Sequence, residues 1–514
     1  MTTGTPGDTY EAVIGLEIHV QLRTEQKLFC PDRTGFGEAP NTNVCPVCLG
    51  LPGALPVVNR EAVELAVRAC LAFGCTVHER SVWARKNYFY PDLPKGYQIS
   101  QFEEPLATGG VFEVELEDGP DQAGVDRGDG DRDASGSLAV RIRRIHMEED
   151  AGKSIHDRFP EATAVDLNRT GTPLIEMVSE PDLRSPAQVR AWLTGVKQVL
   201  EYLQVSDCNM EEGSLRVDAN VSIRPAGSQE LGTKTELKNM NSFSGVERAL
   251  AVEIDRQRAV VAAGGQVEHE TLLWDERRGD VRPMRTKEES HDYRYFPDPD
   301  LPPLQVSSAL IEAVEAELPE LPAARRARFR EEYQLPAYDA GVLTARRPLA
   351  EYYEQTARAT GEPKEASNWI MGPVLAAMKA RGLEADAFPV RPSHLAELIE
   401  LVGKGTINRN VAKDVLDRML ESARDEEGEG SDVRTAGDIV RDEGLAQVSD
   451  TGQLQAWVDD ALAAHPEEVA RFREGESRLQ GFFMGEVMKR SRGKADPGEV
   501  ARLLAERLEA GHHG

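Results

Sequence analysis

The sequence predicts an α+β fold, in which an N-terminal domain with a mixed or antiparallel sheet is followed by all-α helical and tail domains. Two observations predict it. In the first part of the chain, short apolar–polar alternations typical of strands recur between turns rich in glycine and proline. In the last part, apolar residues recur at helical spacing, as in 395–402, which follows a Ser393 cap. We therefore expect domains at residues 1–303, 304–407 and 408–514.

Composition limits the class of protein. The 514 residues are 40% apolar and 29% charged, as expected of a soluble protein with several domains. No apolar run approaches the about 20 residues of a membrane span, and the N-terminus lacks the features of a signal peptide, so we expect a cytoplasmic protein without a membrane partner. The net charge of −28 argues against a general nucleic-acid binder but leaves room for a local basic patch.

The first predicted strand, 10–22, carries a row of polar side chains. Its apolar and polar residues alternate, which places Glu17, His19 and Gln21 on one face. A carboxylate and an imidazole on that face are able to complete an acidic site formed elsewhere in the chain. The polar face of an exposed strand explains the same pattern, and both interpretations stay open here.

Four potential zinc ligands follow. Cys45 and Cys48 have the spacing of a zinc knuckle, and Cys30 and Asp32 supply two more ligands. A structural zinc site is one interpretation; a knuckle without metal, held by Pro46 and hydrogen bonds, is the other. The remaining three cysteines are expected to be small core residues.

A helix is predicted at 61–73, ending at Gly74, and a loop of alternating basic and aromatic residues follows it at 83–101. Lys86 lies in this loop among tyrosines, which predicts either a surface for an anion or nucleotide, or a loop held by buried tyrosine rings. The segment 118–137 has almost no apolar residues, and we assign it no function.

Acidic residues collect where two strand-like segments end. Glu148 and Glu149 follow an apolar alternation, and Glu176 follows another. Carboxylate oxygens suit Mg²⁺, which keeps several waters and binds substrate phosphates. A surface hairpin with ordinary glutamates is the competing interpretation.

Further acids, lysines and amides follow a helix at 185–202. A predicted strand pair at 210–225 carries Asp218, and the segment 232–243 carries Lys238, a mixture suited to a metal-bound nucleotide. At the other end of the chain, the basic cluster Lys489, Arg490, Arg492 and Lys494 is either a contact for RNA or the solvated end of a helix.

Long motifs occur in one order along nearly the whole chain. They are VIGLEIHVQL, NTNVCPVCLGLPGALPVVN, RKNYFYPDLPKGYQISQ, HMEEDAGKS, DLNRTGTPLIEMVSEPD, MEEGSLRVDAN and DYRYFPDPDLPP. Through these motifs the chain resembles the B subunits of the bacterial aspartyl/glutamyl-tRNA(Asn/Gln) amidotransferases. The resemblance implies an ATP- and Mg²⁺-dependent enzyme that phosphorylates the side-chain carboxylate of misacylated Glu-tRNA(Gln) or Asp-tRNA(Asn), after which ammonia displaces the phosphate.

The resemblance also implies partners. An amidase, which is the A subunit of such an enzyme, supplies the ammonia from glutamine, and a small C subunit holds the heterotrimer together. Residues 1–303 would then form a catalytic cradle for ATP, Mg²⁺ and the 3′ end of the aminoacyl-tRNA, and 408–514 would contact the tRNA. A scaffold protein that binds tRNA without catalysing activation is the alternative, as is a free-standing kinase or ligase acting on a small carboxylic acid.

Site residues are carried over from the family's motifs position by position. The Mg²⁺ ligands fall on Glu17, His19, Glu148 and Glu176, of which Glu148 and Glu176 are also catalytic. Lys86 is expected to serve catalysis and the nucleotide, and Asp218 and Lys238 are expected to contact the nucleotide. The chain departs from zinc-bearing relatives, whose first pair is C-x-C, because Asp32 takes the second position.

Overall fold

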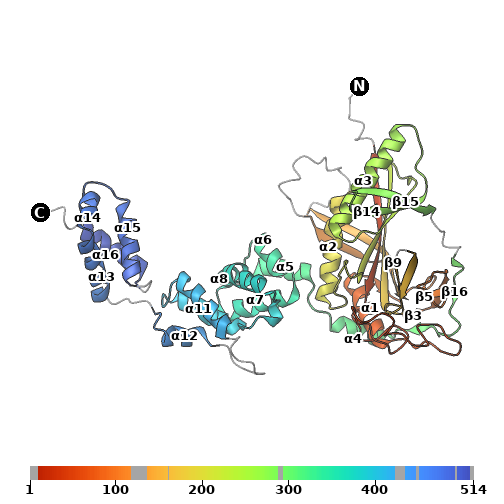
Figure 1. Cartoon of the computed structure of the whole chain (residues 1–514), viewed down its shortest axis with the longest axis horizontal. Helices are drawn as coiled ribbons and strands as arrows, with labels where there is room; N and C mark the ends of the chain where they lie inside the picture. Colours follow the sequence, from red (N-terminus) through yellow and green to blue (C-terminus); the bar gives the residue numbers. More distant parts are fainter. Residues whose placement is uncertain are drawn as a thin grey trace. The chain divides into compact units, whose positions relative to one another are not determined.

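The structure is a computed structural model, and it divides the chain into two compact units, Met1–Ala323 and Ala324–Gly514. Each unit is described by itself (Figure 1). No described helix is long and apolar enough to cross a membrane. The segment 118–137, to which we assign no function, lies almost wholly outside the described residues, and the predicted domain ranges stay predictions. The structure describes residues 10–116, 136–159, 161–286, 293–422, 434–446, 451–491 and 495–509.

The first unit is built on one large mixed sheet. Its strand order is β15-β14-β13-β12-β1-β11-β8-β6-β2, with β7 paired to β8, and only β13 and β14 run parallel. The α+β prediction is therefore confirmed, with helices dominating the rest of the chain. The strands are β1 (Tyr10–Gln21), β2 (Thr76–Val77), β6 (Ala107–Thr108), β7 (Val111–Glu115), β8 (Ser137–Glu149), β11 (Pro173–Ser179), β12 (Leu215–Pro225), β13 (Thr235–Lys238), β14 (Glu270–Asp275) and β15 (Asp280–Thr286).

The sheet has one apolar and one polar face at its centre. On β1, Leu16, Ile18 and Val20 are buried in the core, and the residues between them face the other side. The apolar face is covered by helices, among them α2 (Pro186–Tyr202) and α3 (Phe243–Ala262), which run beside the sheet in Figure 1. The polar face is thus left for a site.

Helix ends follow local sequence signals. The Ser185 and Ser242 hydroxyls cap α2 and α3, each accepting a hydrogen bond from a backbone N–H three residues later. Helix α1 (Arg60–Ala72) begins after an Asn59 cap, and Gly74 takes a φ of +68° just beyond it, as the predicted end requires. The three cysteines expected in the core are buried and free: Cys70, Cys75 and Cys208.

Small sheets flank the large one. Strand β4 (Trp83–Asn87) pairs with β5 (Tyr97–Gln101) on one side and with β16 (Phe296–Pro297) on the other, and β5 lies against β8, since the Gln98 side chain donates to the Glu149 carbonyl at 2.7 Å. The other elements are the pair β9 (Lys153–Phe159) and β10 (Ala162–Asp166), the pair β3 (Arg80–Ser81) and β17 (Leu304–Gln305), and α4 (Ser308–Ala316).

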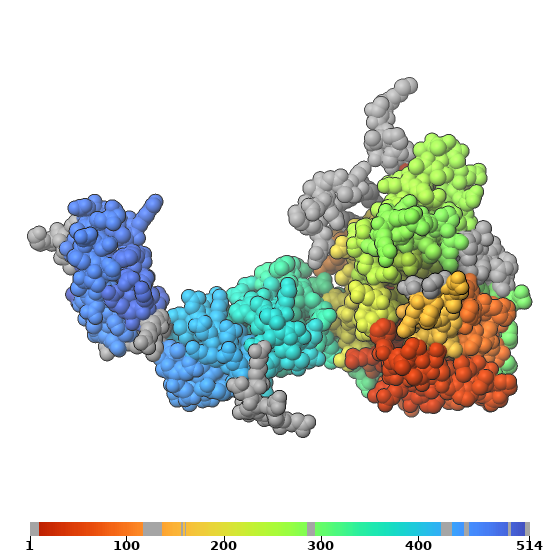
Figure 2. Space-filling model, in the orientation of Figure 1, coloured from red at the N-terminus to blue at the C-terminus, as the bar shows by residue number. Residues whose placement is uncertain are grey.

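The loop before α1 is fastened to the β9–β10 hairpin. The Asn41 side chain donates to the Val165 carbonyl at 3.0 Å, and the Asn43 N–H donates to the Asn168 side chain at 2.8 Å. Figure 2 shows the two segments as adjoining red and amber surfaces of the first unit. These bonds hold the cysteine-bearing loop on the sheet domain.

The second unit is helical and contains two separate apolar clusters. One runs from Phe329 to Val440 and the other from Leu454 to Leu508. Helix α10 begins at Pro392, so the predicted Ser393 cap is wrong: proline is favoured at the first helical position, and Arg391 precedes it without a side-chain cap. The elements are α5 (Pro322–Glu332), α6 (Ala337–Leu343), α7 (Arg347–Thr360), α8 (Pro363–Trp369), a π-helix (Ile370–Val374), α9 (Leu375–Arg381), a 3₁₀ turn (Ala385–Ala387), α10 (Pro392–Gly403), α11 (Arg409–Ser422), α12 (Ala436–Asp442), α13 (Thr451–Ala464), α14 (Pro466–Arg473), α15 (Leu479–Arg490) and α16 (Pro497–Glu509).

Candidate active site

Strand register builds the candidate site on the polar face of the sheet. His19 on β1 lies directly opposite Glu176 on β11 and Arg216 on β12, and Glu176 in turn lies opposite His146 on β8. Directly opposed residues of antiparallel strands project from the same face. Glu148, two residues after His146, therefore joins the same row.

Three of the predicted metal ligands come together there. His19 Nε2 lies 3.2 Å from Glu176 Oε2 and 3.7 Å from Glu148 Oε1, and one potential ligand atom from each residue falls within 4.8 Å of the others. All three are largely buried, with 2% of the Glu148 side chain exposed. Two carboxylates and one imidazole leave room in the coordination sphere of a divalent cation for water or phosphate oxygens.

The electrostatics keep both carboxylates ionised. Burial favours the protonated acids, but hydrogen bonding and positive charge from His146, His19 and Lys86 hold the pKa of Glu148 below its usual range and that of Glu176 well below it. Burial lowers the pKa of His19, but the hydrogen bond to Glu176 and the charges of both glutamates outweigh it, so the His19 pKa is raised. The pair of carboxylates therefore attracts cations.

Lys86 supplies positive charge beside this group. Its Nζ lies 5.1 Å from the centre of the Tyr293 ring and 6.0 Å from that of Tyr88, and within the described chain no carboxylate approaches it to 4.0 Å. Burial lowers its pKa, but Glu148 and Glu176 raise it by more, and the ammonium stays charged. Lys86 is therefore partly enclosed by tyrosines and lies beside Glu148 and Glu176; the tyrosine rings of the loop itself are half-buried or exposed, and its role as a surface for an anion or nucleotide stays a prediction.

Glu17 lies apart from the other three predicted Mg²⁺ ligands. It is opposite Asp218 on β12 and accepts a hydrogen bond from Asn220 Nδ2 at 3.1 Å. Lys238 Nζ lies 2.5 Å from Asp218 Oδ2 and 3.5 Å from Glu236 Oε1. Two of the three predicted nucleotide contacts, Asp218 and Lys238, thus form a second group on the same face, with Glu17 beside it, whereas Lys86 lies at the first group.

The neighbouring acids have other partners. Glu149 forms a buried ion pair with Lys95 and accepts a hydrogen bond from the Ile99 N–H at 3.0 Å. Asp150 accepts from Gln21 Nε2 at 2.9 Å and lies 3.0 Å from Arg216 Nη2. The geometry therefore favours Glu148 over Glu149 as the member of the cation-binding group.

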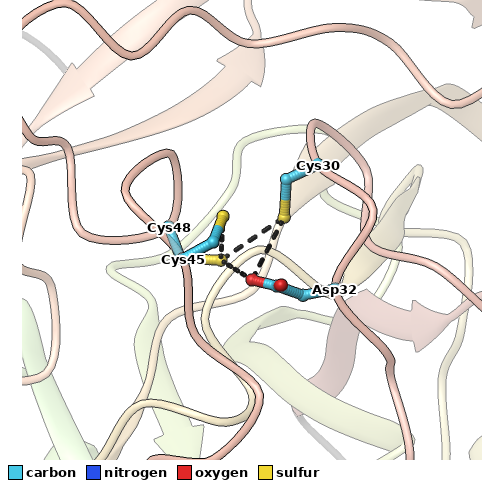
Figure 3. A group of neighbouring side chains, drawn as sticks. All are labelled: Cys30, Asp32, Cys45 and Cys48. Carbon is cyan, nitrogen blue, oxygen red and sulfur yellow. Dashed lines mark hydrogen bonds between the residues drawn. The ribbon is translucent and has the colours of Figure 1, made fainter.

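The four predicted zinc ligands also meet (Figure 3). Cys48 Sγ lies 3.4 Å from Cys30 Sγ, 3.8 Å from Cys45 Sγ and 3.1 Å from Asp32 Oδ2. Hydrogen bonding from Cys30 lowers the pKa of Cys48 to about 6, helped by the charge of Lys27, whose Nζ lies 3.4 Å from Cys48 Sγ. A thiolate among two thiols and a carboxylate is a donor set that zinc binds tetrahedrally.

Two residues of the site were missed from the sequence. His146 Nε2 lies 3.6 Å from Glu176 Oε2 and 3.8 Å from Glu148 Oε2, and Arg216 lies beside His19. Each stands two residues before a predicted site residue, Glu148 and Asp218, so the period of a strand was the available signal. The predicted strand pair at 210–225 was wrong, because a turn precedes the single strand β12.

The basic cluster near the C-terminus is described only in part. Lys489 and Arg490 end α15, and Arg490 pairs with Glu486 at 2.7 Å, whereas Arg492 and Lys494 lie outside the described residues. Its contact with RNA stays a prediction.

The family models give the class of protein to which this sheet domain and the helices after it belong. Residues 12–312 match the model of the GatB/GatE catalytic domain, and 351–508 match that of the GatB domain.

Curated relatives extend the match over nearly the full length. The B subunit of the aspartyl/glutamyl-tRNA(Asn/Gln) amidotransferase of Moorella thermoacetica is 52% identical, over 97% of this chain and 100% of its own. The proteins of the same name from Prosthecochloris aestuarii and Pelodictyon phaeoclathratiforme are each 50% identical, over 98% and 97% of this chain and 99% of their own. The chain therefore belongs to the family of aspartyl/glutamyl-tRNA(Asn/Gln) amidotransferase B subunits, which confirms the resemblance.

Proposed function

We propose that this chain activates the side-chain carboxylate of misacylated Glu-tRNA(Gln), Asp-tRNA(Asn) or both with ATP, as a cytoplasmic subunit of a glutamine-dependent amidotransferase. The observation that carries the proposal is the close group of His19, Glu148 and Glu176 beside the Lys86 ammonium. A site with ionised carboxylates and a lysine that lacks a carboxylate partner in the described chain suits a cation and the phosphates of ATP. The names of the relatives supply the substrate class.

The chemistry follows from the weakness of a carboxylate as an acyl donor. A carboxylate oxygen of the attached amino acid attacks the γ-phosphorus of ATP, and ADP leaves with the electron pair of the broken bond. Ammonia then attacks the carbonyl carbon of the acyl phosphate, inorganic phosphate leaves, and the amide of Gln-tRNA(Gln) or Asn-tRNA(Asn) forms. Most of the rate comes from positioning and from neutralising phosphoryl charge.

Each residue has a distinct role in this proposal. His19, Glu148 and Glu176 hold Mg²⁺, with Glu17 further along the same strand; when bound, Mg²⁺ neutralises charge on the phosphates of ATP. Lys86 contacts the transferred phosphoryl group as a point charge. In the second group on the sheet face, Lys238 contacts the nucleotide, with Asp218 holding its ammonium in place.

The proposal includes partners and a structural metal. The amidase, as the A subunit, supplies ammonia, a small C subunit completes the heterotrimer, and the tail domain with Lys489 contacts the tRNA. Cys30, Asp32, Cys45 and Cys48 hold a structural zinc ion, which their convergence supports.

The test combines the purified chain with Glu-tRNA(Gln) or Asp-tRNA(Asn), ATP, Mg²⁺ and free ammonium, with and without the two partners. Ammonium replaces the missing glutaminase, so amidated tRNA and ADP from the chain alone are the expected result. Product only after the partners are added would mean that the site requires the assembly. No product with either tRNA, despite tRNA binding, would support the scaffold function instead.

A further inference from the structure

On the polar face of the sheet, Arg216 lies between the cation-binding group (His19, Glu148 and Glu176) and the second group (Asp218 and Lys238). It lies directly opposite His19 in the β1–β12 register, two residues before Asp218 on its own strand. Its Nη2 lies 3.0 Å from Asp150 Oδ1, and Asp150 is held from the other side by Gln21 Nε2 at 2.9 Å. The guanidinium therefore has a defined place beside the cation-binding group.

This guanidinium is only partly used by the protein. Nη2 forms an ion pair with Asp150, whereas Nε is buried and has no hydrogen-bond partner among the described residues. The side chain is 36% exposed, so a ligand on the sheet face is able to reach it. Because Nε is enclosed by the protein, a ligand would meet the exposed part of the guanidinium.

Arg169 provides an internal contrast. It also approaches Asp150, at 3.5 Å, but its Nε donates to the Ala151 carbonyl at 2.9 Å and its Nη2 donates to the Gly152 carbonyl at 2.6 Å. Two arginines therefore share one carboxylate, and one of them is used to hold a loop. Arg216 is the one whose guanidinium lies beside His19 on the sheet face with part of it exposed.

The charge balance shows what Arg216 is suited to bind. Glu148, Glu176 and Asp218 bring negative charge to this face, and the phosphates of ATP would add more. Lys86 lies at one side of the cation-binding group and Arg216 at the other, beside His19. A guanidinium presents several N–H donors in a plane, which matches the oxygens of a phosphoryl group better than an ammonium does.

We propose that Arg216 is a further catalytic residue, whose guanidinium donates hydrogen bonds to the phosphoryl oxygens of ATP as the γ-phosphoryl group moves to the carboxylate of the aminoacyl-tRNA. This inference rests on the proposed function. A carboxylate oxygen forms the new bond to phosphorus, the bond from phosphorus to the β–γ bridging oxygen breaks, and ADP keeps the electron pair. Arg216 transfers no proton; it stabilises charge that is spread over the phosphoryl oxygens in the transition state.

The experiment compares Arg216→Ala, Arg216→Lys and the control Arg169→Ala in the complete assembly with its partners. Single-turnover formation of ADP and acyl phosphate is measured with saturating Glu-tRNA(Gln), or Asp-tRNA(Asn) if that is the substrate of the wild type. The affinity for tRNA and the melting temperature are measured alongside. The reactions are repeated with millimolar guanidinium or ethylguanidinium salts.

We expect Arg216→Ala to lower the rate by about 10²- to 10³-fold, the usual cost of one preorganised donor, with tRNA affinity within a few-fold. Added guanidinium ions should restore part of that rate, and Arg216→Lys should keep the fold while remaining well below the wild type. Arg169→Ala should lower the melting temperature but gain nothing from guanidinium ions.

Other results would overturn the inference. A structural role would make the rate of Arg216→Ala follow its folded fraction, with full activity in Arg216→Lys and no response to guanidinium ions. Failure of the wild type itself to form ADP in response to the tRNA would instead remove the proposed function, and the inference with it.

Discussion

The chain contains two candidate metal sites, and their ligands are held in opposite ways. His19, Glu148 and Glu176 come from three adjacent strands of one sheet, whereas Cys30, Asp32, Cys45 and Cys48 come from loops. Strand ligands are fixed by the register of the sheet, which is itself secured by the buried apolar face. Loop ligands lack that support; the hydrogen bonds of Asn41 and Asn43 fasten their loop to the β9–β10 segment, and a bound metal would add to this hold.

The donor atoms of the sheet site and the loop site also differ. The sheet site offers two carboxylates and an imidazole, with cationic side chains around it, as suits a hard ion that shares its shell with phosphates. The loop site offers three sulfurs and one carboxylate, which already fill a tetrahedral shell. A site with open positions serves chemistry, and a filled one serves stability. The predictions below test that division.

The largest effect is expected at the sheet site. Glu148→Gln should lower ammonium-dependent amidation of the tRNA by about 10²-fold or more, because changes merely behind a metal ligand already cost 10- to 100-fold. Glu180→Gln is the matched control, since Glu180 pairs with the exposed Arg143 just beyond β11. Rates are measured with saturating ATP, and tRNA affinity should stay within a few-fold. Normal ADP formation by Glu148→Gln in the presence of the tRNA would show that the metal assignment is wrong.

A somewhat smaller loss is expected at Lys86. Lys86→Met keeps the length and the tyrosine contacts but removes the charge beside Glu148 and Glu176, so we expect a loss of about 10²-fold in kcat. The melting temperature should also fall, because the attraction to Glu148 and Glu176 outweighs the cost of burying the ammonium, and the variant leaves both buried carboxylates with less compensating charge. A drop in stability with unchanged kcat would instead assign Lys86 to the fold.

At the loop site we expect a loss of stability with little loss of activity. Cys45→Ser removes one of its sulfurs, and we expect the free energy of unfolding to fall by about 2 kcal/mol and the melting temperature by roughly 4–8 °C. The rate per folded molecule should stay within about twofold of the wild type. Elemental analysis should find one zinc ion per wild-type chain and less in the variant. Wild-type protein that folds normally and contains no zinc after purification without chelators would remove the structural metal.

The sequence predicts the residues of both sites, but it predicts which of them lie together only where they are close along the chain. The cysteine spacing is local, so Cys45 and Cys48 were bound to lie together, and alternation put Glu17, His19 and Gln21 on one face. Which strand lies next to β1 is a long-range property, and it decides that His19 meets Glu176 and Arg216 while Glu17 meets Asp218. No local pattern carries that register.

The sequence also could not predict which acidic residue pairs with which cationic one. Glu148 and Glu149 are adjacent and identical in type. Only in the folded chain does Lys95, just before β5, form an ion pair with Glu149, so that Glu148 remains available to the site. The fold class was easier to predict, because it depends on periodicity within each segment.

The smallest effect is expected in the second group on the sheet face. Lys238 Nζ is shared between Asp218 and Glu236, and the latter also accepts a hydrogen bond from the Thr271 hydroxyl at 2.9 Å. If Lys238 contacts the nucleotide before and during the reaction alike, Lys238→Met should raise the KM for ATP about tenfold and leave kcat within about twofold. The measurement is a titration of ATP at saturating tRNA.

The matched control is Lys197→Met, which removes an ammonium that lies 3.6 Å from Glu201 on α2, a helix that packs under the apolar face. Its KM for ATP should be that of the wild type. A fall in kcat for Lys238→Met equal to the fall in kcat/KM would mean that Lys238 acts only in the transition state. The division of the sheet face into a cation-binding group and a nucleotide-binding group would then have to be redrawn as one catalytic centre.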